Sequence, residues 1–354
     1  MKLEKLITLL FILFSLSINA QMYNIRTFGA KGDGVSDDTK YILKALDQIK
    51  IDNSKNAVLY IPIGQYLVSK SIDLEQNISV IGEDSNSSII LVNAIDCGAF
   101  VIKDNKNPTE YIYRTIKNLT ILGPDRSKNP LAWKNEAINN PKSVGLKVYG
   151  IRNKIQDCKI NGFLWAGIEI NSSYYNYIQN SLLINNRIGI LITNTSTSAF
   201  VNNCEMRTNA IGVIIEDNSY ANFINNNMIE SNISNFLYPD KSLDDVNSLT
   251  TGKGVLIKNA GKNFVQNNYF EQHYVNVLID NSNNNEISNN FFAIGDLMPG
   301  YSNNQVFFKI IGNSYDNSII SNRNMKSKTI LDAQKSYIQK DLQKKNIIEK
   351  GKSN

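Results

Sequence analysis

Ile155-Gln-Asp-Cys-Lys-Ile160 is the first of six copies of one short pattern, in which an aliphatic residue is followed two positions later by Asp or Asn. The copies begin at Ile155, Ile178, Val201, Ile224, Val265 and Ile287. Successive copies are 22 or 23 residues apart, except for one step of 41 residues. A period in the low twenties with alternating apolar residues is typical of a solenoid whose coils are short strands. We therefore expect an all-β protein built as a stack of coils.

Alternation within each copy separates core positions from surface positions. The fifth residue after the first is always apolar, so it should face the core, and the residues on either side of it should face outward. The outward column next to the following loop reads Asn161, Ile184, Arg207, Glu230, Glu271 and Ala293. The other outward column reads Lys159, Leu182, Glu205, Met228, Tyr269 and Phe291.

These columns place charged residues together. Arg207, Glu230 and Glu271 should form one line, with Glu205 beside it. The two acids would lie roughly 5 Å apart if the insertion after Glu230 adds no coil, and roughly 10 Å apart if it adds one. Both separations are near those of glycosidase carboxylates, and two close acids would raise the pKa of one of them. The competing interpretation is a set of solvated side chains on an exposed sheet.

Other residues extend the candidate site. Tyr269 and Trp133 have rings that can stack on sugars, and Lys159 is a third candidate for substrate binding. His273, the single histidine, lies two residues after Glu271 and is a candidate general acid or base. Glu271 with His273 provides too few ligands for a metal site, so we expect no metal and no cofactor; a calcium ion enters only if the chain is a lyase.

Irregular steps in the repeat mark insertions. The extra residues fall within 124–144, 231–253 and 295–305, each time after the same strand, so the three insertions should line one edge of the stack. The recurring Asn two positions into each copy suits a left-handed corner between strands, where its amide can also bond the next coil.

The two termini differ from the repeats. Residues 1–20 combine two lysines, an apolar run and a small residue before Gln21, which predicts a cleaved signal and a secreted, periplasmic or cell-surface protein without stable membrane insertion. Residues 324–354 carry eight Lys against three acidic residues, which accounts for the whole net charge of +5. The remaining chain is near neutral, which argues against a nucleic-acid partner. We expect this Lys-rich tail to be helical or disordered.

The segments Phe28-Gly-Ala-Lys-Gly-Asp-Gly-Val-Ser-Asp-Asp-Thr39 and Val58-Leu-Tyr-Ile-Pro-Ile-Gly-Gln-Tyr66 resemble the N-terminal motif of the pectate-lyase superfamily, the rhamnogalacturonase and epimerase-like proteins. The resemblance implies a right-handed parallel β-helix with three strands per coil and a carbohydrate-active extracellular role. The helix expected over 37–50 would cap the open end of a β-helix domain over 21–323.

The catalytic motifs of well-known relatives are missing from the sequence. It contains no Gly-His-Gly, Asn-Thr-Asp or Arg-Ile-Lys of polygalacturonase-like hydrolases, and no acidic cluster of calcium-dependent pectate lyases. We therefore predict an exported glycoside hydrolase that cleaves a polysaccharide with paired carboxylates. Two alternatives stay open: a polysaccharide lyase of pectate-lyase type, and a non-catalytic glycan-binding or surface solenoid. A homo-oligomer stays open as well.

Overall fold

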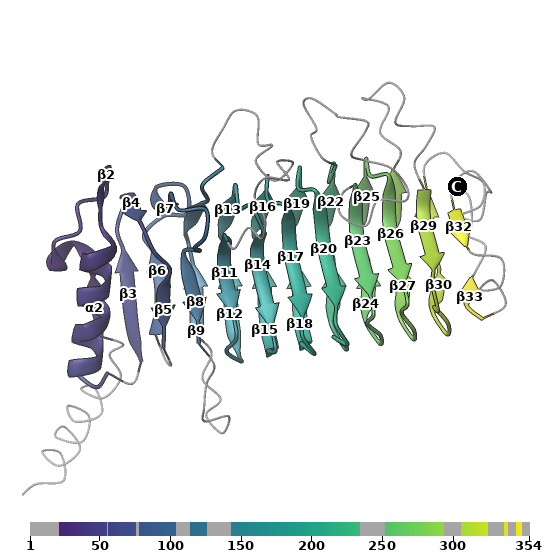
Figure 1. The fold of residues 1–354 in the computed structure, drawn as a ribbon, viewed down its shortest axis with the longest axis horizontal. Coiled ribbons are helices and arrows are strands. Elements are labelled where there is room, and N and C mark those ends of the chain that lie inside the picture. The colour runs from purple at the N-terminus through teal and green to yellow at the C-terminus, as the bar shows by residue number, and fades with distance from the viewer. Residues whose placement is uncertain are drawn as a thin grey trace, which may run out of the picture.

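The computed structural model describes residues 21–54, 56–75, 78–103, 114–125, 143–233, 252–293, 306–324, 336–338 and 345–348. These residues form three long parallel sheets that wind round one core as a right-handed β-helix (Figure 1). The predicted fold class is confirmed.

Each coil contributes one strand to each sheet in turn. Sheet A contains β1 (Met22–Asn24), β3 (Ala57–Ile61), β6 (Ile78–Gly82), β9 (Arg114–Lys117), β12 (Asn153–Gln156), β15 (Tyr174–Gln179), β18 (Thr197–Asn202), β21 (Phe223–Asn225), β24 (Phe264–Gln266), β27 (Glu286–Ser288), β30 (Ser318–Ile320) and β33 (Ile347–Ile348). Sheet B contains β2 (Asp33–Asp37), β4 (Gly64–Val68), β7 (Ser88–Val92), β10 (Thr120–Leu122), β13 (Lys159–Asn161), β16 (Leu182–Ile184), β19 (Glu205–Arg207), β22 (Met228–Glu230), β25 (Tyr269–Glu271), β28 (Phe291–Ala293) and β31 (Arg323–Asn324). Sheet C contains β5 (Ile72–Leu74), β8 (Phe100–Ile102), β11 (Val144–Val148), β14 (Ala166–Asn171), β17 (Ile188–Thr193), β20 (Ile211–Glu216), β23 (Lys253–Lys258), β26 (Val275–Asp280), β29 (Val306–Ile311) and β32 (Ser336–Ile338).

One helix covers the N-terminal end of the stack (Figure 1). After the 3-10 turn η1 (Ile25–Phe28), helix α2 (Thr39–Ile51) buries Ile42, Leu46 and Ile49 against the first coil. The Asp38 carboxylate does not cap the helix; it accepts hydrogen bonds from the backbone N–H groups of Lys31 and Gly32 and so holds the preceding loop. The Asp37 carboxylate instead accepts from the backbone N–H of Thr39, the first residue of the helix, and from the Ser69 hydroxyl.

The repeat register is as the sequence indicates. Ile155 pairs with Ile178, and Ile116 pairs with Ile155 one coil earlier. All six residues at the fifth position are fully buried: Ile160, Leu183, Met206, Ile229, Phe270 and Phe292. The insertions also follow one rule, because residues 126–142, 234–251 and 294–305, which lie outside the described part, each connect sheet B to sheet C.

The corners of the coils are held by asparagine ladders inside the stack. The Asn two positions into each copy is left-handed as expected, with φ of 50° to 56° at Asn180, Asn203 and Asn226, for example. The hydrogen-bonded ladder, however, is formed one residue later. Asn227 donates from its backbone N–H and from Nδ2 to Oδ1 of Asn268, at 2.9 and 3.0 Å. The prediction that the side-chain amide of the left-handed residue bonds the next coil is therefore wrong. Its backbone N–H bonds the next coil instead, as from Asn180 N to Asn202 O at 3.2 Å.

Corresponding ladders run along the other two corners. Asn186, Asn209 and Asn232 are joined between sheets B and C, and Asn222, Asn263, Asn285, Asn317 and Asn346 between sheets C and A. In most members Nδ2 also donates to a backbone carbonyl at the corner, such as Ile224 O in the case of Asn268. Each amide thus satisfies buried backbone groups that have no strand partner at the turn.

The expectation of a helical or disordered tail is wrong for the few tail residues that the structure describes. β32 pairs with β29 in sheet C, and β33 pairs with β30 in sheet A. Asn346 extends the ladder by accepting from Asn317, which explains why this part of a Lys-rich segment joins the stack. Residues 1–20, with the predicted signal, lie outside the described part.

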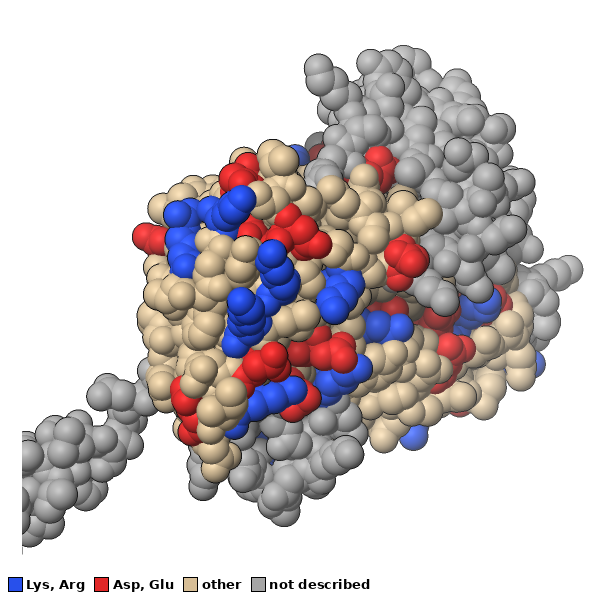
Figure 2. Space-filling view, turned by 60° about the vertical axis from the view of Figure 1, so that its left-hand side comes forward, with Lys and Arg blue, Asp and Glu red and all other residues tan. Residues whose placement is uncertain are grey.

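The surface near the helix-capped end carries charges of both signs. Figure 2 shows Lys and Arg interspersed with Asp and Glu there, and Lys50 pairs with Glu75 at 3.1 Å. No helix within the described ranges is both long and apolar enough to cross a membrane.

The ladder makes a testable demand on stability. Replacing Asn268 by Ala should leave the Asn227 backbone N–H without its acceptor and remove the bond from Asn268 Nδ2 to Ile224 O, at about 1–3 kcal/mol for each buried group left unpaired. Asn227 Nδ2 keeps its bond to Val201 O. We expect Asn268→Ala to lower the free energy of unfolding by at least about 2 kcal/mol in urea titrations. The control Asn202→Ala, at an outward position of β18, should change it by less than about 0.5 kcal/mol. Equal effects of both substitutions would contradict a structural ladder.

Candidate active site

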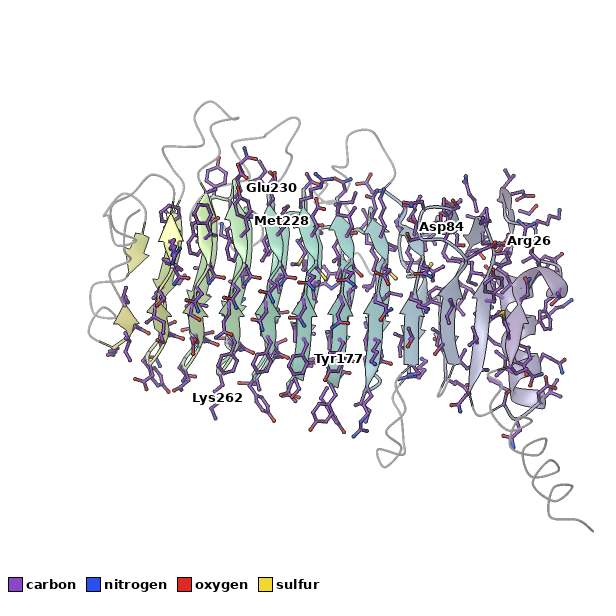
Figure 3. The ribbon with its side chains drawn as sticks, turned by 180° about the vertical axis from the view of Figure 1, so that it is seen from behind. Arg26, Asp84, Tyr177, Met228, Glu230 and Lys262 are labelled. Atoms are coloured by element: carbon purple, nitrogen blue, oxygen red, sulfur yellow. The ribbon has the colours of Figure 1, made fainter. Side chains whose placement is uncertain are left out.

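The predicted line of charged residues lies on the outer face of sheet B, at the edge next to the insertions. Arg207 pairs in register with Glu230, and Glu230 with Glu271. Since β22 and β25 are direct neighbours, the insertion between them adds no coil, and the two acids are one strand apart, about 4.8 Å between backbones. Figure 3 shows Glu230 and Met228 near this edge of the stack.

The side chains around Glu230 form two hydrogen-bonded pairs. Arg207 Nε contacts Glu205 Oε1 at 2.7 Å, and the Tyr269 hydroxyl donates to Glu271 Oε2 at 2.6 Å. Burial raises the pKa of Tyr269, and the bond to Glu271 raises it further, so the hydroxyl stays protonated and fixes the orientation of the carboxylate. Glu271 is therefore a positioned acceptor.

Glu230 has the environment of a general acid. Partial burial raises the pKa of Glu230, the negative charge of Glu271 raises it further, and Arg207 opposes them to a smaller extent. The two carboxyl groups thus differ in environment. The pKa of Glu230 is raised, which favours its protonated form, whereas Glu271 accepts a hydrogen bond from Tyr269.

His273 does not join this group. It is fully buried, its Nε2 lies 3.1 Å from Asn232 Nδ2, and its Nδ1 lies 2.8 Å from Asn276 Oδ1. It thus occupies the next position of the ladder formed by Asn186, Asn209 and Asn232. Since the Asn232 amide donates to Nε2, the proton of a neutral imidazole belongs on Nδ1. The interpretation of His273 as a surface acid or base beside Glu271 is therefore wrong.

The remaining candidates are not brought to Glu271. Lys159 shares the column of Tyr269, but Leu182, Glu205 and Met228 stand between them, which makes a separation of four strands, roughly 19 Å. Trp133 lies outside the described residues.

A groove on the outer face of sheet C was not predicted. It has a volume of about 210 Å³, and it is lined by Trp165, Arg187, Ile188, Ile211, Ile214, Glu216, Leu256 and Lys258. Four outward aliphatic residues of this sheet are buried in a second apolar cluster on the same face: Leu191, Ile214, Leu256 and Leu278.

Charged groups border the groove floor. The Arg187 guanidinium lies 5.4 Å from the centre of the Trp165 ring, and burial lowers its pKa. Glu216 and Lys258 are register partners, and burial followed by the charge of Asp217 raises the pKa of Glu216. The sequence contained one indication of this pair of charges. Glu216 stands two residues after Ile214, and Lys258 stands two residues after Leu256.

No group of three or more His, Cys, Asp or Glu able to hold a metal ion occurs among the described residues.

The interior place of His273 can be tested by pH. Burial lowers the pKa of His273 from 6.5 to about 3, so between these values the unfolded chain binds a proton that the folded chain does not. The contribution of His273 to stability is therefore complete above pH 6.5 and is lost as pH falls toward 3. We expect His273→Asn, which restores an ordinary ladder residue, to fold and to lose less melting temperature than the parent between pH 7 and pH 4. An unchanged pH dependence would contradict a buried neutral histidine.

Similarity to known proteins agrees with this architecture. Residues 22–237 match the family described as "Rhamnogalacturonase A/epimerase, pectate lyase-like". The "Preneck appendage protein" of Bacillus phage PZA is 34% identical over 67 residues, which are 19% of this chain and 7% of that protein. "Mannuronan C5-epimerase AlgE1" of Azotobacter vinelandii is 33% identical over 75 residues, which are 19% of this chain and 5% of that protein. The chain thus spans only a small part of the curated relatives that it matches.

Solved structures share the fold at low identity. "Geobacillus virus E2 - ORF18" has a TM-score of 0.64 and 16% identity, covering 94% of this chain and 60% of that one. The AlgE6 A-module of the Azotobacter vinelandii epimerase has a TM-score of 0.52 and 16% identity, covering 94% and 99%. DFA-IIIase of Arthrobacter chlorophenolicus A6 has a TM-score of 0.55 and 13% identity, covering 86% and 68%. The matched region and the three-sheet coil together show that this chain belongs to the rhamnogalacturonase A/epimerase, pectate lyase-like family of carbohydrate-active parallel β-helices.

Proposed function

We propose that the protein is an exported glycoside hydrolase that cleaves a polysaccharide at the carboxylates of sheet B. The observation that carries this proposal is the raised pKa of Glu230 beside Glu271 on the adjacent strand. Export is supported by the sequence of residues 1–20, and a polysaccharide substrate by the family.

The separation of the acids favours retention of configuration. Strand pairing separates the backbones of the two glutamates by about 4.8 Å, which is close to the roughly 5 Å between the carboxyl groups of retaining enzymes. Glu230 then donates its proton to the glycosidic oxygen while Glu271 attacks the anomeric carbon and forms a glycosyl ester. Water, deprotonated by Glu230, releases the sugar and restores both groups. The Tyr269 hydroxyl positions the attacking carboxylate.

Replacement of Glu230 by Gln tests this mechanism. We expect kcat/KM on a cleaved polysaccharide to fall by about a hundredfold or more, since general acid catalysis contributes roughly 10²–10⁴. Because the pKa of Glu230 is raised, the activity of the parent should persist at pH values above the usual pKa range of a carboxyl group. It should fall as pH rises through the pKa of Glu230, because the general acid then loses its proton. Product analysis should show retained configuration.

The matched control is Glu75→Gln, which removes an exposed carboxylate paired with Lys50 near the helix-capped end and should leave the rate unchanged. Full activity of Glu230→Gln together with Glu271→Gln would refute the carboxylate mechanism. A parent that binds polysaccharides without cleaving any of them would instead identify a glycan-binding solenoid.

A second candidate is cleavage of an acidic polysaccharide by β-elimination in the groove of sheet C. Lys258 provides a cation for a uronate, and Arg187, whose pKa is lowered by burial, lines the same groove as the candidate base. Lys159, Arg207, Tyr269 and His273 suit this reaction less, because they lie on sheet B or in the interior.

The two candidates give different products. β-Elimination produces an unsaturated uronate, so its absorbance should rise during the reaction and should disappear in Arg187→Ala while persisting in Glu230→Gln. Hydrolysis should give no such absorbance and the opposite response to the two substitutions.

A further inference from the structure

The corner between sheets C and A has a hollow of its own, on the opposite edge of the stack from Glu230. Figure 3 shows Lys262 at this lower edge and Glu230 at the upper one. The hollow measures about 440 Å³, within the range of about 300–1,000 Å³ that is typical of ligand sites. It is lined by Asn218, Tyr220, Asn259, Ala260, Gly261, Lys262, Asn281 and Asn283.

One coil has a glycine in the column of residues that borders the hollow. Thr197, Tyr220, Gly261 and Asn283 occupy one column and are joined by parallel bridges along the corner. A Cβ atom on Gly261 would lie 2.6 Å from the Asn283 carbonyl oxygen and 2.7 Å from its Oδ1, so this position admits only glycine without movement of its neighbour. Asn283 therefore packs directly against Gly261, and Tyr220 is bridged to Gly261 on the other side.

The side chains that line the hollow have the chemistry to bind a sugar ring. Tyr220 is 47% exposed and presents an aromatic surface to the C–H groups of a pyranose. The side-chain amides of Asn218, Asn259 and Asn283 make no hydrogen bond to any described residue, so they can donate to and accept from hydroxyl groups. Asn281, in contrast, is engaged with Asp280 and with the backbone of Asn313.

The charge of Lys262 indicates which class of sugar the hollow would bind. Lys262 is the single ionised side chain among the lining residues, and it is exposed at the rim. An ammonium beside neutral amides favours a pyranose that carries one carboxylate over a neutral one.

We propose that this hollow is a second glycan-binding site, which holds one uronate unit of an acidic polysaccharide through Tyr220, Lys262 and the three amides. It lies on a different corner from the carboxylates of sheet B and from the groove of sheet C, so it acts as an anchoring site and takes no part in bond cleavage. The inference does not depend on which reaction the protein catalyses.

Hydrogen exchange with short oligosaccharides tests the site directly. The probes are an oligogalacturonate, an oligomannuronate and a neutral oligoglucan, each added to the double variant Glu230→Gln with Arg187→Ala, which suppresses turnover by either candidate reaction. We expect an oligouronate to protect the backbone of 217–220, 259–262 and 281–284. Tyr220→Ala in the same background should need about tenfold more probe for that protection, since loss of a central aromatic contact typically costs more than 1 kcal/mol.

Two further variants make the outcome decisive. Lys262→Gln should weaken protection by the oligouronates, and it covers the case in which Tyr220→Ala fails to fold. Tyr175→Ala, a control that removes another exposed ring outside the hollow, should leave protection unchanged. Absence of protection with every probe, equal protection in Tyr220→Ala and the parent, or protection by the oligoglucan alone would overturn the proposal. None of these binding results tests the carboxylate mechanism, which is tested separately by the polysaccharide-cleaving activity of Glu230→Gln and Glu271→Gln.

Discussion

The side-chain amides stacked inside the three corners are the interaction on which the structure depends. A coil of three short strands must turn sharply three times, and each turn leaves backbone N–H and C=O groups inside the stack without a strand partner. Asn227, Asn209 and Asn263, one at each kind of corner, show the same solution: Oδ1 of one coil accepts from the coil below, and Nδ2 donates to a carbonyl. Because these bonds connect equivalent residues in successive coils, they also fix the register of the sheets.

This register determines where function can be placed. Once inward positions are occupied by the ladders and the aliphatic core, variable chemistry is confined to the outward columns and to the insertions. His273 shows how strict the division is, since the single histidine occupies an inward ladder position and accepts the bond that an asparagine would accept. Glu230 and Glu271, only a few residues from a ladder, are on outward positions and keep access to solvent.

The sequence was sufficient for the register and therefore for the alignment of Arg207, Glu230 and Glu271, because period and alternation alone place them in one column. It was not sufficient where the chain turns. Side chains alternate between inward and outward only along a strand, and this alternation is interrupted at each corner. Counting along a strand therefore predicts neither that His273 points inward nor that Asn227 occupies an inward ladder position. The groove of sheet C was missed for a related reason: Trp165 and Arg187 belong to corners rather than to the repeated triplets, and only their folded positions bring them to Glu216 and Lys258.

The regularity of the stack also makes the pair of acids informative. Parallel pairing places equivalent residues directly beside one another, with backbones about 4.8 Å apart, so two glutamates in consecutive coils repel, which is unfavourable for folding. Glutamine at either position would remove that repulsion and keep the shape. The chain instead has Arg207 in the next coil and a tyrosine hydroxyl on Glu271, which reduce the repulsion without abolishing it. An arrangement that opposes stability and perturbs the pKa of one member is characteristic of a functional site, and this is the strongest physical reason to place the chemistry on sheet B.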